Sequence, residues 1–393
     1  MRLFLGGCEM RLPSRVATTD KSCVIISSVR EMVQLEVEWN ALWLKAKGSF
    51  SQTYSLAFHS WNEVAAPAGR SLFCIVVREG GRLVLVFPLL RYRKGPCWML
   101  RPLGPNAAEG TAILVDPESE SQENVRLAWQ AVETVSKADI IHMPFVEVGS
   151  VLDRSIRRGR NLLTDRDVAP FVDLHEFPDW EKYELAIGAN TRQQLNRKRR
   201  RLSEMGDLEF VEVDPVTTPE YARELLECMF SHKKVWAERV GKRGVWITSP
   251  EYRRFLYKWI SDPRNVQSMR VFAILIDRTP IAVKLASFGV SHIDLNIAGF
   301  HSDPRYAKYS PGFVLDEYWM KIAFEKHLNV DFGVGDEPYK LFWSSNARIN
   351  VASYHIPQTL VGRTVTRLWR LKRIALQHMA ELRERPSKAH AGS

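Results

Sequence analysis

The sequence predicts an α+β (mixed α/β) fold of two related domains, each a mostly antiparallel sheet flanked by helices. The first observation is a repeat: two segments about two hundred residues apart have the same succession of β-meander, helix and strand. The second is a divider between the copies, residues 170–180, which is rich in proline, aspartate and aromatic residues. The third is size, because 393 residues with 45% hydrophobic content can bury two ordinary cores.

The first copy begins with a hairpin. Its strand-like runs, Leu72–Val77 and Leu83–Leu90, meet at the glycine pair Gly80-Gly81, which favours a tight turn. A helix-compatible segment, Glu123–Val135, then precedes the short apolar strand Ile140–Val146.

The second copy has the same order and a clearer meander. Three strand-like runs follow one another, and a helix and a short strand come after them. These elements are Val271–Ile276, Ile281–Phe288, Ile293–Phe300, Phe313–His327 and Val330–Val334.

We therefore expect four parts along the chain. Residues 1–28 form a loose N-terminus, residues 29–178 a first domain on the acceptor side, and residues 179–360 a second domain with the catalytic site. Residues 361–393 form a basic C-terminal helix or tail, which either lies on a membrane surface or docks onto the second domain, and we favour docking.

Charge favours anionic ligands. The chain has 55 Lys and Arg against 45 Asp and Glu, a formal net charge of +10. The stretch from about residue 180 to residue 205 is predicted to be helical. Within it a basic run, residues 192–201, contains six Lys or Arg and no acid, but no aromatic residues interleave with it. A solvated helix face or contact with an anionic ligand is therefore favoured over nucleic-acid binding.

The cysteines and the lengths of the apolar runs indicate the cellular compartment of the protein. The five cysteines form no CxxC pair, which favours a reducing compartment, and no apolar run reaches the length of a membrane span. We expect a cytoplasmic protein, with contact at the inner face of the membrane as an open alternative.

The turn that opens the second helix is a candidate anion site. Ser310 suits the N-cap and Pro311 the first helical position, while Gly312 lets a phosphate approach the helix N-terminus. Arg305 and Lys308 would add positive charge. An ordinary helix start is the alternative.

A second candidate group follows the last strand of the repeat. Asp336 or Glu337 could accept a proton from an attacking amine or hydroxyl, and Tyr339 could donate one to a leaving thiolate. Lys340 would orient a carboxylate or hold a phosphate. The alternative is a polar surface turn in which Lys340 pairs with one of these acids.

These motifs carry a family resemblance. The string from Gly299-Phe300 through Tyr306–Gly312 to Asp331-Phe332 and Gly335–Lys340 resembles the GNAT-superfamily acyltransferases of the cellulose-biosynthesis CelD/BcsL type. The basic run Thr191–Leu202 is similar to the same family. The resemblance implies a tandem GNAT fold, related to the Fem peptidyltransferases, that transfers an acyl group, usually acetyl, from a coenzyme A thioester.

The resemblance also implies which residues contact acetyl-CoA. The turn from residue 305 to residue 312 matches the pyrophosphate loop, and backbone N–H groups of residues 298–300 would hold the oxyanion. The expected donor-binding residues are Ala298, Gly299, Phe300, Arg305, Lys308, Tyr309, Ser310 and Gly312.

We expect chemistry without a metal. The sequence has no HExxH motif, no spaced Cys/His set and no GxxxxGK[ST] loop, so zinc and nucleotide hydrolysis are disfavoured. His292, His301 and His355 are expected to be structural or surface residues.

The acceptor is expected to be a sugar, an amino sugar or another cell-envelope or exopolysaccharide precursor. Two alternatives stay open. A Fem-like aminoacyl transferase would take its donor from charged tRNA, which the positive charge also suits. A non-catalytic component of a polysaccharide-synthesis machine would keep the fold and bind no thioester.

Overall fold

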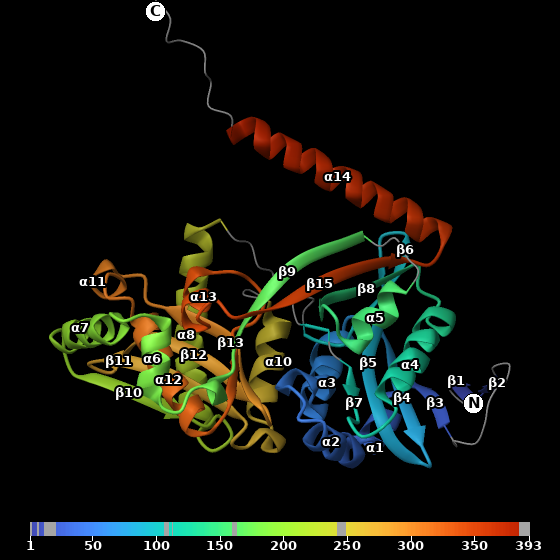
Figure 1. Cartoon of the computed structure of the whole chain (residues 1–393), viewed down its shortest axis with the longest axis horizontal. Helices are drawn as coiled ribbons and strands as arrows, with labels where there is room; N and C mark the ends of the chain where they lie inside the picture. The colour runs from blue at the N-terminus through green and yellow to red at the C-terminus, as the bar shows by residue number, and fades with distance from the viewer. Residues whose placement is uncertain are drawn as a thin grey trace, which may run out of the picture.

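The computed structural model describes residues 2–5, 8–11, 21–105, 110–111, 113–158, 163–241 and 249–384. One 15-stranded sheet runs through the molecule, and helices cover both of its faces (Figure 1). The sheet order is β10-β11-β12-β13-β14-β9-β15-β8-β6-β5-β4-β3-β1-β2, with β7 beside β5. The predicted α+β class is therefore confirmed.

The first half supplies one end of this sheet. Its strands are β1 (Arg2–Leu5), β2 (Cys8–Arg11), β3 (Lys21–Ile26), β4 (Ser71–Glu79), β5 (Arg82–Lys94), β6 (Cys97–Pro102), β7 (Leu114–Val115) and β8 (Ile140–Glu147). Its helices are α1 (Val29–Gln34), α2 (Glu36–Lys45), η1 (Phe50–Gln52), α3 (Tyr54–His59), η2 (Ser60–Ala65), α4 (Ser121–Val135) and α5 (Val151–Arg157).

The second half supplies the other end. Its strands are β10 (Leu208–Val213), β11 (Met269–Ile276), β12 (Thr279–Phe288), β13 (His292–Phe300) and β14 (Asn329–Asp331). The helices of this half are η3 (Leu174–Glu176), α6 (Trp180–Ile187), α7 (Thr191–Ser203), α8 (Pro219–Arg239), α10 (Pro250–Ile260), η4 (Pro263–Asn265), α11 (Pro304–Ala307), α12 (Pro311–Glu325) and α13 (Pro338–Trp343).

Two strands join the halves. β9 (Leu163–Val172) comes before the second half in the chain but pairs with β14, and β15 (Arg348–Pro357) comes after it but pairs with β8. β9 and β15 also pair with each other. Each half thus has the same strand order and takes its last strand from beyond its own segment, so the predicted repeat is confirmed. The division into domains at residue 178 stays a prediction, because strand pairing crosses it.

The structure corrects three sequence predictions. The N-terminus is not loose up to residue 28, because the apolar segment Lys21–Ile26 is strand β3 and pairs antiparallel with β4. The helical stretch from residue 180 to residue 205 is two helices, since Gly188 (φ 149°) ends α6. The strand predicted for residues 330–334 ends at Asp331.

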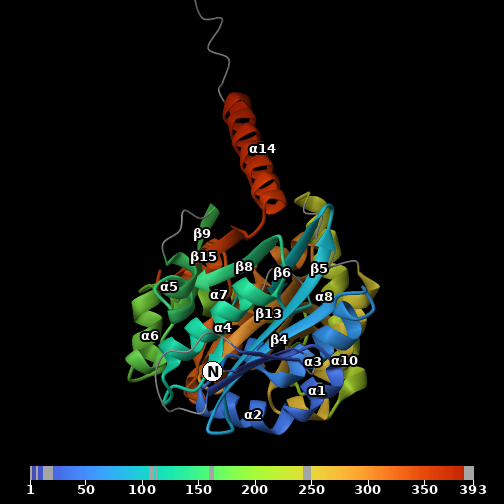
Figure 2. The ribbon, with the colours of Figure 1, turned by 90° about the vertical axis from the view of Figure 1, so that its right-hand side faces the viewer.

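The cores lie between the sheet and its helices. In the second half, α7 and α12 bury one sheet face around Trp319 and Leu195. Helices α8 and α10 bury the opposite face around Met229 and Trp259. The first half is arranged in the same way, with α4 and α5 packed on one face of the sheet and α1, α2 and α3 on the other (Figure 2).

The C-terminal helix α14 (Leu360–Glu384) docks on the first half, whereas docking on the second was expected. Val365 and Trp369 pack against a small cluster that contains Cys97, Met99 and Ile140. The reason is the path of β15, which carries the chain back to β8 before the helix begins. No helix in the described ranges is long and apolar enough to cross a membrane.

Candidate active site

The candidate site begins where β13 and β14 part. The two strands pair in parallel only at His292–Asn329, Ile293–Val330 and Asp294–Asp331. β14 ends there, while β13 continues to Phe300. Within the described residues no strand pairs with this edge of β13 beyond Asp294. The sheet is thus open beside the second part of β13.

Backbone donors face this opening. The N–H of His301 donates to the carbonyl of Ile281 at 2.9 Å, which fixes the alternation of the β12–β13 ladder. In such a ladder every second N–H points to the other edge, so the N–H groups of Ala298 and Phe300 point into the opening. Two of the backbone donors expected from the sequence are therefore available there.

Gly299 has a packing role. A Cβ at this position would lie 2.2 Å from the carbonyl oxygen of Met229 on α8. Only glycine lets α8 lie this close to β13. The N–H of Gly299 points toward β12 and not into the opening. Gly299, which the sequence analysis expected to contact the donor, therefore offers no backbone donor there.

Helix α12 begins beside the end of β13. A Cβ on Gly312 would lie 2.5 Å from Cε1 of Phe300, so the glycine lets the Phe300 ring lie against the first helical turn. In the part of the chain that the structure describes, the N–H of Gly312 has no acceptor. An anion at this turn would meet this donor and the positive end of the helix dipole.

Ser310 occupies the N-cap as expected, but its side chain does not cap the helix. Its backbone is left-handed (φ 51°, ψ 60°), and its carbonyl accepts from Phe313 and Val314. The Ser310 hydroxyl accepts a hydrogen bond from Nζ of Lys198 at 3.0 Å. Burial lowers the pKa of Lys198. A cation from α7 therefore stands at the N-terminus of α12.

The basic run of α7 is not only a solvated helix face, because part of it contacts α12. Arg199 forms an ion pair with Glu317 of α12, and Lys321 pairs with the same carboxylate at 2.7 Å. Arg192, at the other end of α7, pairs with Glu181 instead. The side of α7 that carries Lys198 thus faces α12, which the sequence analysis did not predict.

The other cations expected at the turn lie on its outer side. Arg305 is 72% exposed and pairs with Asp303 at 2.7 Å. The exposed Lys308 has its Nζ 4.9 Å from the ring centroid of Tyr309. Arg305, Lys308 and Tyr309 thus lie near one another, on α11 and just after it. The charge of Arg305 is already paired with Asp303.

The acidic turn after β14 is held by Lys340. This lysine is buried, and its Nζ donates to the Val334 carbonyl at 2.7 Å and pairs with Glu337 at 2.9 Å. Gly335 has φ 117°, where a Cβ would lie 2.5 Å from Oε2 of Glu337. Asp336 is exposed. The pairing of Lys340 with an acid, which was the open alternative, is therefore observed.

Tyr339 is held in its protonated form. Burial raises the pKa of its hydroxyl, and the negative charges of Asp316 and Glu337 raise it further. The residue is 40% exposed, and its ring centroid lies 5.4 Å from Nζ of Lys284. The hydroxyl therefore carries a proton at neutral pH, although its raised pKa makes it a weaker acid than an ordinary tyrosine.

Lys284 and Asp316 form a buried ion pair that the sequence analysis missed. Each side chain is 3% exposed, and Trp319 Nε1 donates to Asp316 at 2.9 Å. Nζ of Lys284 is 5.6 Å from the ring centroid of Phe300, so the pair lies below the opening. One charged residue in the apolar strand β12 was the available signal, since lysine is seldom buried without a partner.

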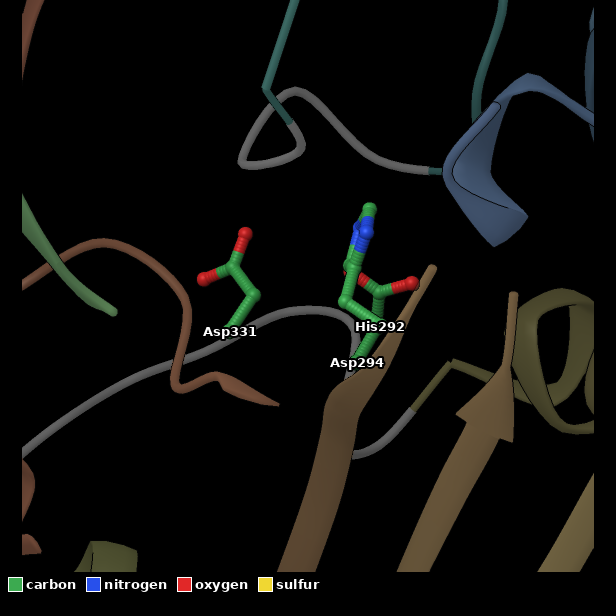
Figure 3. Close-up of side chains that lie close together, drawn as sticks. All are labelled: His292, Asp294 and Asp331. Atoms are coloured by element: carbon green, nitrogen blue, oxygen red, sulfur yellow. The ribbon is translucent and has the colours of Figure 1, made fainter. Parts of the chain in front are cut away.

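A second missed group lies on the opposite face of the sheet. His292 and Asp294 occupy alternate positions of β13, and Asp331 is the register partner of Asp294 on β14 (Figure 3). The intervening Ile293 and the neighbouring Val330 face the core under α12. The three side chains, here called the HDD cluster, therefore project away from α12.

Partners outside the HDD cluster orient each member. Ser291 Oγ lies 3.0 Å from His292 Nδ1, the N–H of Phe50 donates to Asp294 at 3.3 Å, and the N–H of Gly333 donates to Asp331 at 2.7 Å. Because Phe50 belongs to the first half, the cluster lies where the two halves meet.

The cluster is also electrostatically coupled. Burial and the charge of Asp294 raise the pKa of Asp331 to about 6. Burial opposes the protonation of His292, but Asp294 and Asp331 together raise its pKa. One ligand atom from each of the three side chains lies within 4.8 Å of the other two, close enough to surround one cation. A His-x-Asp pair in one strand and an Asp at the end of the next was the signal in the sequence.

A comparison with known protein families identifies the kind of domain in the second half. Residues 189–341 match the family profile of the acetyltransferase (GNAT) domain, which identifies a GNAT-type domain in the second half. The matched range contains the β13–β14 opening, the start of α12 and the HDD cluster. The narrower CelD/BcsL resemblance stays a prediction.

Two of the solved structures that match illustrate the fold. FemX superposes with a TM-score of 0.56 and 12% identity over 85% of this chain and 98% of its own. The C-terminal domain (DUF2156) of an Agrobacterium fabrum protein described as a lysylphosphatidylglycerol synthetase gives a TM-score of 0.52 and 13% identity, over 87% of this chain and 95% of its own. At these identities the likeness shows the fold alone. The comparison with curated proteins finds no match.

Proposed function

We propose that this chain transfers an acetyl or related acyl group from a coenzyme A thioester to an amine or hydroxyl of a cell-envelope or exopolysaccharide precursor. One observation carries the proposal: Lys198 and the N-terminus of α12 offer positive charge beside the β13–β14 opening, and the HDD cluster lies where the opening begins, on the opposite face of the sheet. The GNAT-type domain over residues 189–341 supports the reaction class.

The donor would be held at the start of α12. Its pyrophosphate would meet the N–H of Gly312 and the Nζ of Lys198, and Lys308 would add charge from outside. The thioester arm would enter the opening, and its carbonyl oxygen would accept from the N–H groups of Ala298 and Phe300. These donors would stabilise the oxyanion of the tetrahedral intermediate.

The HDD cluster would receive the acceptor. Asp331 would take a proton as the nitrogen or oxygen attacks the thioester carbonyl carbon, and His292 and Asp294 would share the charge. The carbon–sulfur bond then breaks, and Tyr339 would donate a proton to the leaving thiolate. We assign Glu337 and Lys340 to holding the turn, because they pair with each other.

The test is release of coenzyme A thiol from acetyl-CoA in the presence of amine and hydroxyl sugars. Asp331→Asn should lower turnover about a hundredfold while donor affinity stays unchanged. Asp336→Asn, which changes an exposed carboxylate on the turn after β14, is the matched control and should change little. Full turnover in Asp331→Asn, together with a loss of turnover in Asp336→Asn or Glu337→Gln, would show that the base is Asp336 or Glu337 and not Asp331.

A second candidate is Fem-like aminoacyl transfer from charged tRNA. The fold similarity to FemX and the net charge of +10 favour it. It predicts that amino-acid transfer depends on tRNA and that acetyl-CoA does not bind. Acyl transfer from the thioester without RNA would decide for the first candidate.

A further inference from the structure

The C-terminal helix has a surface that the proposed transfer reaction does not use. Five of its side chains are large, apolar and exposed. They are Leu360 (78%), Val361 (47%), Leu368 (58%), Leu371 (63%) and Ile374 (53%). Leu368, Leu371 and Ile374 recur at three-residue spacing, so they lie along one side of α14. An isolated exposed leucine needs no explanation, but a row of them does.

The same segment is strongly basic. Between residues 360 and 375 there are five cations and no acid. The cations are Arg363, Arg367, Arg370, Lys372 and Arg373, all exposed. At 3.6 residues per turn, Arg370 flanks the apolar row on one side and Lys372 on the other. Long basic side chains in these positions can extend past an apolar row toward anionic groups.

One side of α14 is already occupied by the body of the protein. Val365 and Trp369 pack on the first half, and a Cβ on Gly362 would lie 2.1 Å from the carbonyl oxygen of Asp139. Arg373 pairs with Asp165 of β9. The helix is therefore fixed at its base, and its C-terminal part projects from the body (Figures 1 and 2). The apolar row is exposed although the opposite side of the same segment is packed.

The β5–β6 hairpin extends this surface. Lys94 Nζ lies 5.4 Å from the ring centroid of Trp369, which joins the hairpin to the helix. Arg93 and Lys94 are exposed, and Trp98 is 39% exposed under the guanidinium of Arg91. Exposed tryptophan beside cations is typical of residues that lie at the boundary between lipid and water.

We propose that α14, together with the tip of the β5–β6 hairpin, docks on the surface of an anionic phospholipid bilayer. The apolar row would enter the headgroup boundary, and the flanking cations would meet lipid phosphates. A second copy of the chain is the other possible occupant of an apolar helix face. The charge disfavours it, because two such helices would bring ten cations and no acid together over residues 360–375.

The test is flotation of the full chain with phosphatidylcholine vesicles that do or do not contain phosphatidylglycerol. We expect binding that needs the anionic lipid and weakens with salt. Leu368→Ser/Leu371→Ser and Arg367→Gln/Arg370→Gln should each lower the affinity for these vesicles tenfold or more. All four side chains are exposed, so the variants should keep the thermal midpoint of the native chain.

Two matched controls use other surfaces. Leu185→Ser removes an apolar side chain of similar exposure (59%) on α6, and Arg197→Gln/Arg200→Gln removes two exposed cations from α7. Both should bind vesicles like the native chain. Equal binding to neutral and anionic vesicles, or unchanged binding by the α14 variants, would overturn the proposal. So would a native chain that does not bind vesicles but forms a dimer that the α14 variants do not form.

Discussion

Two glycines without a Cβ atom shape the proposed donor site. At Gly312 the missing side chain makes room for the Phe300 ring, and at Gly299 it makes room for the backbone of α8. The sequence suggested that both glycines serve a ligand. The structure gives each a packing partner within the protein, and only Gly312 also has a backbone donor free for an anion.

This packing predicts the effect of Gly312→Ala. The new methyl group would lie 2.5 Å from Phe300, so the ring must move away from the start of α12. We expect a loss of about 1–3 kcal/mol in unfolding free energy and weaker binding of acetyl-CoA. Chemical denaturation and calorimetry would measure the two effects. The double variant Gly312→Ala/Phe300→Ala should recover stability, and a failure to recover would contradict the contact.

At the scale of elements, buried charge joins β12 to α12. Lys284 and Asp316 are almost completely buried, so each charge needs the other as its counter-ion. The sequence predicted both elements nearly to their ends, because their apolar periodicity is strong. It did not predict the pair, since two charges 32 positions apart meet only when the helix packs on the sheet.

Lys284→Met should therefore destabilise the protein by about 3–5 kcal/mol, because it leaves the Asp316 carboxylate buried without a counter-ion. Lys284→Met/Asp316→Leu should restore most of this loss. The free energy of unfolding in urea measures both. Equal stability of the single and double variants would show that the pair does not interact.

A pair of histidines links β8 to β15. The rings of His142 and His355 stack with their centroids 4.3 Å apart. Burial and, to a smaller extent, the positive charges of His355, Arg101 and Lys94 together lower the pKa of His142 to about 3. Burial, with Lys94, also lowers the pKa of His355. Both imidazoles are thus neutral in the folded chain.

The pKa of His142 predicts how stability depends on pH. The unfolded chain binds a proton near pH 6.5, but the folded chain does not until about pH 3. Stability from this group is complete above pH 6.5 and falls as the pH drops between these values, by about 1.4 kcal/mol per unit. His142→Phe should flatten the decline in Tm from pH 7 to pH 5. His175→Phe, at an exposed site, should not, and an equal slope in all three proteins would contradict the assignment.

For the whole molecule, the exchange of β9 and β15 is the defining feature. The sequence predicted the repeat from its meanders and helices, which are local patterns. It did not predict the exchange, because the local sequence of a strand does not specify which distant strand it pairs with. The pairing of β9 with β14 and of β15 with β8 is seen only in the structure. The HDD cluster was missed for the same reason, since Asp294 and Asp331 meet through strand register.

The exchange predicts that the two halves unfold together. Each half loses a strand of its own sheet if the other unfolds, so calorimetry should show one cooperative transition for the full chain. Two separated transitions, each with its own enthalpy, would show that the halves are stable alone.

The most direct test of the donor site is calorimetric titration with acetyl-CoA. Saturable binding by the native chain is expected, and Lys198→Gln should weaken it about tenfold by removing the cation at the start of α12. Arg192→Gln, on the same helix but paired with Glu181, is the control and should bind like the native chain. No binding of acetyl-CoA or of any longer acyl-CoA by the native chain would contradict the central claim.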